Sequence, residues 1–145
     1  MESNQTNQLI SSWLSFTHIQ TKITDELEAI LQEKHQLSVK EFYVLLFLSE
    51  TPNKKLKLQE LQTMVGLSQS AMSRLVSRFE AKGCGALKRH HCIDDRRAIY
   101  TSLTEEGEEK LKKALVTFQE TLEQAFADEN IQAELKGIIL RHIKR

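Results

Sequence analysis

The order of the elements expected between residues 56 and 103 constrains the fold of this chain more than any other feature. Two short helical patterns, at residues 56–65 and 68–82, lie on either side of Gly66. One or two extended residues can precede the first pattern, Gly66 ends it, and Ser68 is the expected N-cap of the second. A basic stretch, a charged tip and an alternation of apolar and polar side chains follow the two patterns, and such an alternation is typical of a strand with one buried face. The expected outgoing strand, tip and return strand occupy residues 86–91, 93–97 and 98–103. Helix, turn, helix and hairpin in this order predict a winged helix-turn-helix.

The helical pattern at residues 68–82 separates apolar from polar side chains. Its apolar face suits packing on the preceding helices and consists of Ala71, Met72, Leu75, Val76 and Phe79. The opposite face has small hydroxyl side chains that let a helix lie deep in the major groove of DNA, and Gln and Arg that can bond base edges. The alternative is an ordinary solvated helix face, although such a face would more often carry Glu and Lys. The candidate DNA-binding residues here are Ser68, Gln69, Ser70, Ser73, Arg74, Ser77 and Arg78.

The predicted hairpin carries arginines where a wing would meet DNA. An arginine suits the narrow, strongly negative minor groove, and a neighbouring carboxylate can hold its side chain extended. The alternative is a hairpin with a charged, well-solvated turn. The candidate DNA-binding residues of the wing are Arg89, Asp95, Arg96 and Arg97.

The formal net charge of the chain is zero, but the charges are segregated. Residues 74–100 contain seven Lys or Arg and three acidic residues, whereas residues 104–134 contain three Lys and nine acidic residues. The positive charge therefore gathers in the predicted winged unit, where the phosphates of DNA would lie.

Long amphipathic helices are predicted at both ends of the chain. One runs over residues 7–34, and the apolar stripes of the other end span residues 111–122 and 131–139. Between them, a separate helix begins at the capping box of Ser38 and Glu41 and runs to about residue 50. A small winged unit could not bury the apolar stripes of the two ends by itself, so we expect these stripes to form a homodimer. The candidate dimerisation residues are Leu9, Trp13, Leu115, Phe118, Leu122, Leu135 and Ile139.

We therefore expect a mainly α (α+β) fold in a single domain, residues 1–145. Residues 36–104 would form the winged helix-turn-helix, and residues 1–35 and 105–145 the dimerisation helices. The longest apolar run, residues 42–48, is far too short to cross a bilayer, so we expect no membrane partner. The polar start indicates no signal peptide. The expected compartment is the cytoplasm, where the two cysteines would be thiols.

At these residues the chain resembles the multiple-antibiotic-resistance regulator (MarR) family of bacterial transcription factors. The resemblance extends over nearly the whole chain, and Asp94-Asp95-Arg96-Arg97 leading to Leu103-Thr104-Glu105-Glu106-Gly107 is its most specific part. It implies a homodimer joined by the terminal helices, with two winged units that bind a pseudo-palindromic operator in double-stranded DNA. It also matches Gln69, Ser70, Ser73, Arg74 and Ser77 to the recognition face, and Arg96 and Arg97 to the wing arginines.

Two positions depart from the family pattern. Residues 82–89 carry two more residues than family members commonly have between the recognition helix and the wing, so we expect a reshaped turn. Lys57 stands where a helix-capping Ser or Thr is usual. Neither departure removes a group that faces DNA.

Family members often bind small molecules between the dimerisation helices and the DNA-binding unit. The candidate residues for such an effector cleft are Trp13, Phe16, His18, Phe42 and Tyr43. The alternative is that these aromatic side chains simply belong to the core.

The two cysteines allow a redox alternative. Cys84 and Cys92 are eight residues apart, roughly 26 Å at strand rise, whereas a disulfide needs Cα atoms within about 7 Å. Arg89 and two histidines beside Cys92 could make it a reactive sensor, although we favour unreactive thiols. A zinc site made of His90, His91, Cys92 and Cys84 is less favoured, because adjacent residues of a strand point to opposite faces. We therefore expect no metal site and no cofactor.

No catalytic motif is present. The chain lacks a phosphate-binding glycine loop, Gly-x-Ser-x-Gly and His-Glu-x-x-His, so we do not expect an enzyme. A winged-helix module that binds a protein instead of DNA is the alternative from another class, but the polar outer face of residues 68–82 favours DNA. We expect a transcriptional repressor.

Overall fold

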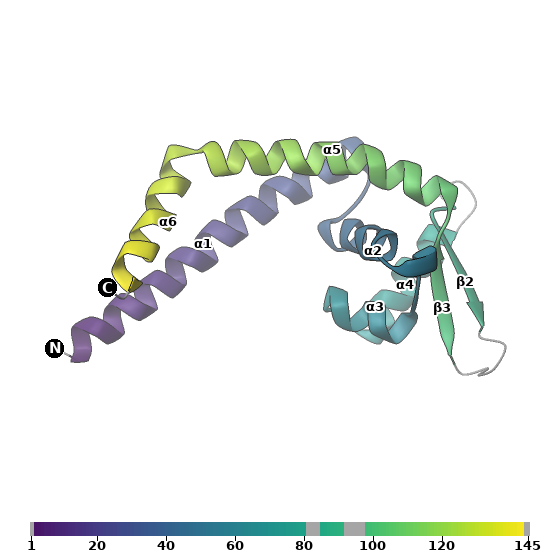
Figure 1. The fold of residues 1–145 in the computed structure, drawn as a ribbon, viewed down its shortest axis with the longest axis horizontal. Coiled ribbons are helices and arrows are strands. Elements are labelled where there is room, and N and C mark those ends of the chain that lie inside the picture. Colours follow the sequence, from purple (N-terminus) through teal and green to yellow (C-terminus); the bar gives the residue numbers. More distant parts are fainter. Residues whose placement is uncertain (1, 81–84, 92–97, 144–145) are drawn as a thin grey trace.

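The computed structural model describes residues 2–80, 85–91 and 98–143. These residues form a mainly helical fold with one small antiparallel sheet, as expected (Figure 1). In chain order the elements are α1 (Glu2–His35), α2 (Val39–Ser49), the short 3-10 helix η1 (Pro52–Lys54), β1 (Lys55–Lys57), α3 (Leu58–Val65), α4 (Gln69–Glu80), β2 (Leu87–His91), β3 (Ile99–Leu103), α5 (Glu105–Ala127) and α6 (Glu129–His142).

Local side-chain chemistry fixes the boundaries of the helices in the winged unit. The predicted capping box begins α2: Glu41 N donates to Ser38 Oγ over 3.0 Å, and Ser38 N donates to Glu41 Oε1 over 2.6 Å. Gly66 ends α3 with a φ of 77°, which favours glycine. The hydroxyl of Ser68 then accepts the backbone N–H of Ala71 and caps α4, as predicted. Lys57 precedes α3 and makes no side-chain cap bond.

The sheet has the strand order β1-β3-β2. Both neighbours of β3 run antiparallel to it, and Thr101 lies opposite Leu56 of β1 and Arg89 of β2. The predicted alternation holds from Tyr100 to Leu103, because Thr101 and Leu103 are buried while Tyr100 and Ser102 are half-buried. Ile99, at the start of β3, is half-buried as well. Strand β1 is longer than the one or two extended residues expected before α3.

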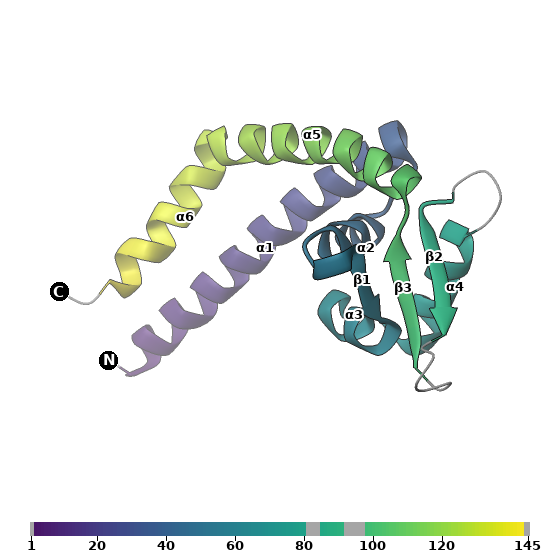
Figure 2. The same ribbon diagram turned by 45° about the vertical axis from the view of Figure 1, so that its right-hand side comes forward.

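The core connects the winged unit to the long helices. Helix α5 packs along α1 and also against α2. Phe42 of α2 is fully buried and stacks on Phe118 of α5, with ring centroids 4.3 Å apart. The winged unit is therefore fixed to the helices that extend from it (Figure 2).

The other end of the molecule is an arm made of α1 and α6, which we call the helical arm. After α5, α6 turns back toward the N-terminal half of α1 and packs on it (Figure 1). Helix α1 begins at Glu2, five residues earlier than expected. Among the described residues, no helix combines the length and apolar character needed to cross a membrane.

Candidate nucleic-acid interface

Helix α4 is seated by its apolar face and presents its polar face outward. Met72, Leu75, Val76 and Phe79 are buried against the rest of the winged unit. Of the candidate DNA-binding residues, Ser73 is half-buried, and the exposed ones are Ser68, Gln69, Ser70, Arg74, Ser77 and Arg78. No Asp or Glu occurs between Gln69 and Ser77. The outward face therefore offers hydroxyl, amide and guanidinium groups without a carboxylate.

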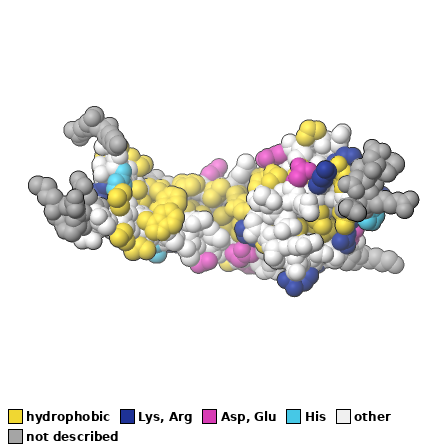
Figure 3. Space-filling view, turned by 90° about the horizontal axis from the view of Figure 1, so that it is seen from below, with side chains coloured by type: hydrophobic (Ala, Val, Ile, Leu, Met, Phe, Trp, Pro, Cys, Tyr) yellow, Lys and Arg dark blue, Asp and Glu magenta, His cyan; other side chains and the backbone are white. Residues whose placement is uncertain are grey.

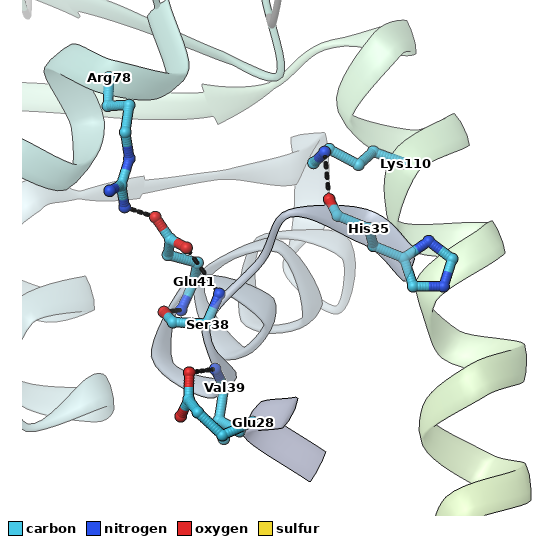
Figure 4. A network of polar contacts seen from close by, with 7 residues as sticks. All are labelled: Glu28, His35, Ser38, Val39, Glu41, Arg78 and Lys110. Atoms are coloured by element: carbon cyan, nitrogen blue, oxygen red, sulfur yellow. Dashed lines mark hydrogen bonds and ion pairs between the residues drawn. The ribbon is translucent and has the colours of Figure 1, made fainter. Parts of the chain in front are cut away.

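The two candidate arginines of α4 differ in their contacts. Arg74 is exposed and has no ion pair with another described residue. Arg78 forms an ion pair with Glu41 at the start of α2 (Figure 4). Sequence analysis placed both arginines on the DNA-facing side because they share a helix face, and it assigned Glu41 only a capping role.

Arg89 ties the first wing strand to α4. Its guanidinium lies 2.8 Å from a carboxylate oxygen of Glu80 and donates to Ser77 Oγ over 3.2 Å. Its backbone N–H donates to the second carboxylate oxygen of Glu80. Arg89, predicted as a wing contact to DNA, is therefore engaged with the C-terminal half of α4 in this structure.

The base of the wing is described, but its tip is not. His90 and Tyr100 stack across β2 and β3 with ring centroids 6.0 Å apart, and Lys55 Nζ lies 5.4 Å from the centroid of the Tyr100 ring. The predicted contacts Asp95, Arg96 and Arg97 lie outside the described residues, as do Cys84 and Cys92.

The candidate dimerisation residues fall into two groups. Leu9, Trp13 and Ile139 are exposed on the helical arm, with exposed fractions of 60%, 66% and 57%. The others are partly buried and pack on this chain's own core: Leu115, Phe118, Leu122 and Leu135. Apolar spacing predicts both groups. It does not show that the group on α5 and α6 is covered by other helices of the same chain.

The helical arm exposes further apolar side chains that are not among the predicted dimerisation residues. Figure 3 shows apolar side chains gathered along this part of the molecule. The additional exposed residues of the arm are Ile10, Leu14, Phe16, Leu140 and Ile143. Their adjacency to the predicted residues was a signal available in the sequence.

The predicted effector cleft is not formed by its five residues within one chain. Phe42 is fully buried and packed on Phe118, so it lines no open cleft. Tyr43 is half-buried beside Phe47. Trp13 and Phe16 stack on each other on the exposed arm, and His18 of the same helix lies 3.7 Å from a carboxylate oxygen of Glu134 in α6. Helical spacing predicted that these residues share apolar faces. In the structure, Trp13, Phe16 and His18 lie on α1, in the helical arm. Phe42 and Tyr43 lie on α2, in the winged unit.

A different cleft opens between the end of α1, the end of α4 and the start of α5. It has a volume of about 770 Å³. Its lining residues are Lys34, His35, Gln36, Arg78, Phe79, Glu105, Glu106, Glu109, Lys110 and Lys113. No sequence pattern reveals this cleft, because its three walls come from segments far apart in the chain.

His35 lies in this cleft as a neutral hydrogen-bonding group. Its Nε2 is 2.7 Å from Thr117 Oγ1, and Lys110 Nζ donates to its backbone oxygen over 2.8 Å. Burial lowers the pKa of His35, and the charges of Lys110, Lys34 and Lys113 lower it further. Among the described residues, no three His, Cys, Asp or Glu side chains gather in a way that could hold a metal ion.

Comparisons with known proteins agree with this architecture. A family model described as MarR family matches residues 35–98. No curated protein sequence matches the chain. Among solved structures, the chain is similar to Sco3205, a MarR family transcriptional regulator from Streptomyces coelicolor in complex with DNA. The TM-score is 0.75 with 29% identity, over 92% of this chain and 82% of that one.

Two further structures extend the likeness. The transcriptional regulator BldR from Sulfolobus solfataricus has a TM-score of 0.73 and 25% identity, with 99% of each chain covered. MarR from E. coli, at 17% identity and a TM-score of 0.68 over 89% of this chain and 93% of that one, is similar in fold. The family model over residues 35–98 and the winged unit between long terminal helices together show that the chain is similar to MarR family transcriptional regulators.

Proposed function

We propose that this chain is a transcriptional regulator that binds a pseudo-palindromic operator as a homodimer, represses transcription and is released by a small-molecule effector. The observation that carries the proposal is the outward face of α4, which combines Gln69 and Arg74 with small hydroxyl side chains and has no carboxylate. Such a face can lie in the major groove and form bidentate bonds to base edges. Sco3205, to which the chain is similar, was crystallised with DNA.

The homodimer is supported by the helical arm. Its exposed apolar side chains come from both terminal helices and form the kind of surface that soluble proteins usually cover. A two-fold dimer would present two copies of α4, and two such helices read a site with matching two-fold symmetry.

Release by an effector is supported by the cleft between α1, α4 and α5. A molecule bound there would touch both a dimerisation helix and the end of α4, where Arg78 and Phe79 lie. Three lysines and three glutamates line the cleft, so we expect a polar effector that can bond both kinds of side chain: Lys34, Lys110, Lys113, Glu105, Glu106 and Glu109. A regulator that occupies its operator until an effector binds would block transcription in the absence of the effector, which is repression.

Two other functions are weaker candidates than operator binding. A winged-helix module for a protein partner would favour an apolar or acidic outer face on α4, which this chain does not have. A redox sensor would act through Cys84 or Cys92, and both lie outside the described residues. We expect mild peroxide to leave the DNA affinity of the wild type unchanged.

The decisive experiment compares DNA binding by variants of the outward face. At fixed salt, Gln69→Ala and Arg74→Ala should weaken binding to the DNA upstream of the protein's own gene and relax base preference. Each lost bidentate contact should cost about 1–3 kcal/mol. Lys112→Ala is the matched control, because it removes one exposed positive charge from α5. Equal affinities for all four proteins would refute the role of α4.

A further inference from the structure

A buried carboxylate joins α4 to the start of α2. Glu41 is only 4% exposed, and its two oxygens have separate partners (Figure 4). Oε1 accepts the backbone N–H of Ser38 over 2.6 Å, and Oε2 forms the ion pair with Arg78 of α4. The carboxylate therefore caps one helix and holds a second.

The start of α2 is also hydrogen-bonded to α1 and to the end of α3. Val39 N donates to Glu28 Oε1 of α1 over 3.1 Å, and Lys40 Nζ donates to the backbone oxygen of Val65 at the end of α3 over 2.7 Å. A continuous set of polar contacts thus connects α1 to α2 and α2 to α4 (Figure 4).

The burial of Glu41 makes its contact with Arg78 sensitive to the position of α4. Only the carboxylate end of the pair has left water, because the Arg78 side chain is 65% exposed. A buried carboxylate needs a compensating charge or hydrogen bonds, so loss of its contact with Arg78 is costly. A movement of α4 relative to α2 would separate the two groups and leave Glu41 buried without its counter-charge. The geometry therefore favours one seating of α4.

We propose that Arg78 is a positioning residue: through its ion pair with Glu41 it fixes α4 on α2 and, through Glu28, relative to the dimerisation helix α1. It thus sets the orientation of the DNA-reading face without itself reading DNA. Arg74, one turn earlier, is exposed, makes no ion pair with a described residue and remains the arginine that contacts DNA. This inference rests on the proposed function, because the orientation of α4 matters only if α4 binds DNA.

The pair is tested first without DNA, in the full-length protein. The variants are Glu41→Gln, which keeps an oxygen for the cap bond to Ser38, Arg78→Gln, their combination, and the conservative Arg78→Lys. In urea unfolding, the midpoint lost by the double variant should be smaller than the sum of the two single losses. Additive losses would overturn the pairing.

Hydrogen exchange then shows whether the pair holds α4. In Glu41→Gln and in Arg78→Gln, the amides of α4 should exchange about tenfold faster, the size expected for one charge-assisted hydrogen bond. The amides of α5 should change less, and Arg78→Lys should restore most of the protection. Exchange in α4 that stays at the wild-type rate in both single variants would overturn the proposal.

DNA binding separates positioning from direct contact. Glu41 is buried on α2, yet Glu41→Gln should weaken binding as much as Arg78→Gln, by about tenfold, and the double variant should bind no worse than either. The dependence of affinity on salt should keep its wild-type slope. Arg74→Gln is the contrast: it should weaken binding while leaving the urea midpoint unchanged.

The opposite result is equally clear. If Arg78→Gln weakens binding while Glu41→Gln binds like the wild type, Arg78 touches DNA directly. A salt slope reduced by about 0.9, the loss expected for one phosphate contact, would say the same. If the wild type binds no DNA at all, the proposed function fails, whereas the unfolding and exchange measurements still decide whether the pair holds α4.

Discussion

At the scale of single residues, Gly107 shows how closely α5 approaches the sheet. A Cβ atom at this position would lie 2.3 Å from the backbone oxygen of Ala86 and 2.5 Å from Leu103 Cδ1. The same backbone oxygen accepts the N–H of Thr104 over 3.1 Å. The first turn of α5 is thus packed directly on the backbone before β2, and this contact fixes the long helix relative to the wing.

We predict that Gly107→Ala destabilises the protein by about 1–3 kcal/mol, because the added methyl group overpacks a backbone contact that cannot easily move. Gly137→Ala in α6 is the matched control: its Cβ would meet only Arg141 Nη2, at 3.7 Å. There the helix propensity of alanine should raise stability by up to about 1 kcal/mol. Urea unfolding of both variants checks the two signs, and a stabilised Gly107→Ala would contradict the packing.

His35 makes stability depend on pH. Its pKa is lowered in the folded protein, first by burial and then by the neighbouring lysines, so the unfolded chain binds the proton more readily. Its contribution is complete above the ordinary pKa of about 6.5 and is lost as the pH falls from that value through the lower pKa of the folded protein. We predict that the free energy of unfolding falls more between about pH 7.5 and 5.5 in the wild type than in His35→Gln. Parallel curves would exclude this role.

At the scale of elements, the parts of the fold that depend on local chemistry were predictable. Ser38 and Glu41 predicted the start of α2, Gly66 predicted the end of α3, and Ser68 predicted the start of α4. Each of these residues bonds or shapes the backbone within a few positions of itself in the chain. Strand β1 was only partly predicted, since three residues show little periodicity and its partner β3 lies more than forty residues away in the chain.

The same distinction applies to the candidate site. The outward face of α4 follows from helical geometry and could be derived from the sequence. The difference between Arg74 and Arg78 could not be derived from the sequence. It arises because Arg78 forms an ion pair with Glu41, and the position of Glu41 depends on how α2 packs. The contact made by Phe42 could not be derived either, because an apolar spacing does not reveal whether its ring faces a cleft or, as here, the ring of Phe118.

The wing should act as a separate contact element. We predict that Arg96→Ala and Arg97→Ala weaken operator binding with little change in the base preference set by α4, because minor-groove and phosphate contacts carry less sequence information. Titrations against an operator and against single-base variants would measure both effects. A base preference altered as strongly as in Arg74→Ala would show that the wing does not act independently.

At the scale of the whole molecule, the helical arm lies at a distance from the winged unit (Figure 1). Its exposed side chains include many large apolar ones. Trp13 on this arm is 66% exposed and is stacked on Phe16 of the same helix. A partner chain that covered these side chains would remove their apolar area from water, at about 25 cal/mol per Å².

We predict that Trp13→Glu converts the protein from dimer to monomer in sedimentation at micromolar concentration, because a buried unpaired carboxylate is costly in an interface. Met64→Glu is the matched control: it also puts a carboxylate in place of an exposed apolar side chain, but on α3. It should remain dimeric. A wild type that sediments as a monomer would refute the homodimer itself.

The most direct measurement is a footprint of the purified protein on the DNA upstream of its own gene. We expect two protected half-sites related by two-fold symmetry, with centres about 10 base pairs or a multiple of that apart. The protection should be lost in Arg74→Ala and reduced in Trp13→Glu. If the folded wild-type protein protects no site, or if Arg74→Ala protects the same site at the same concentration, α4 does not read DNA in this protein.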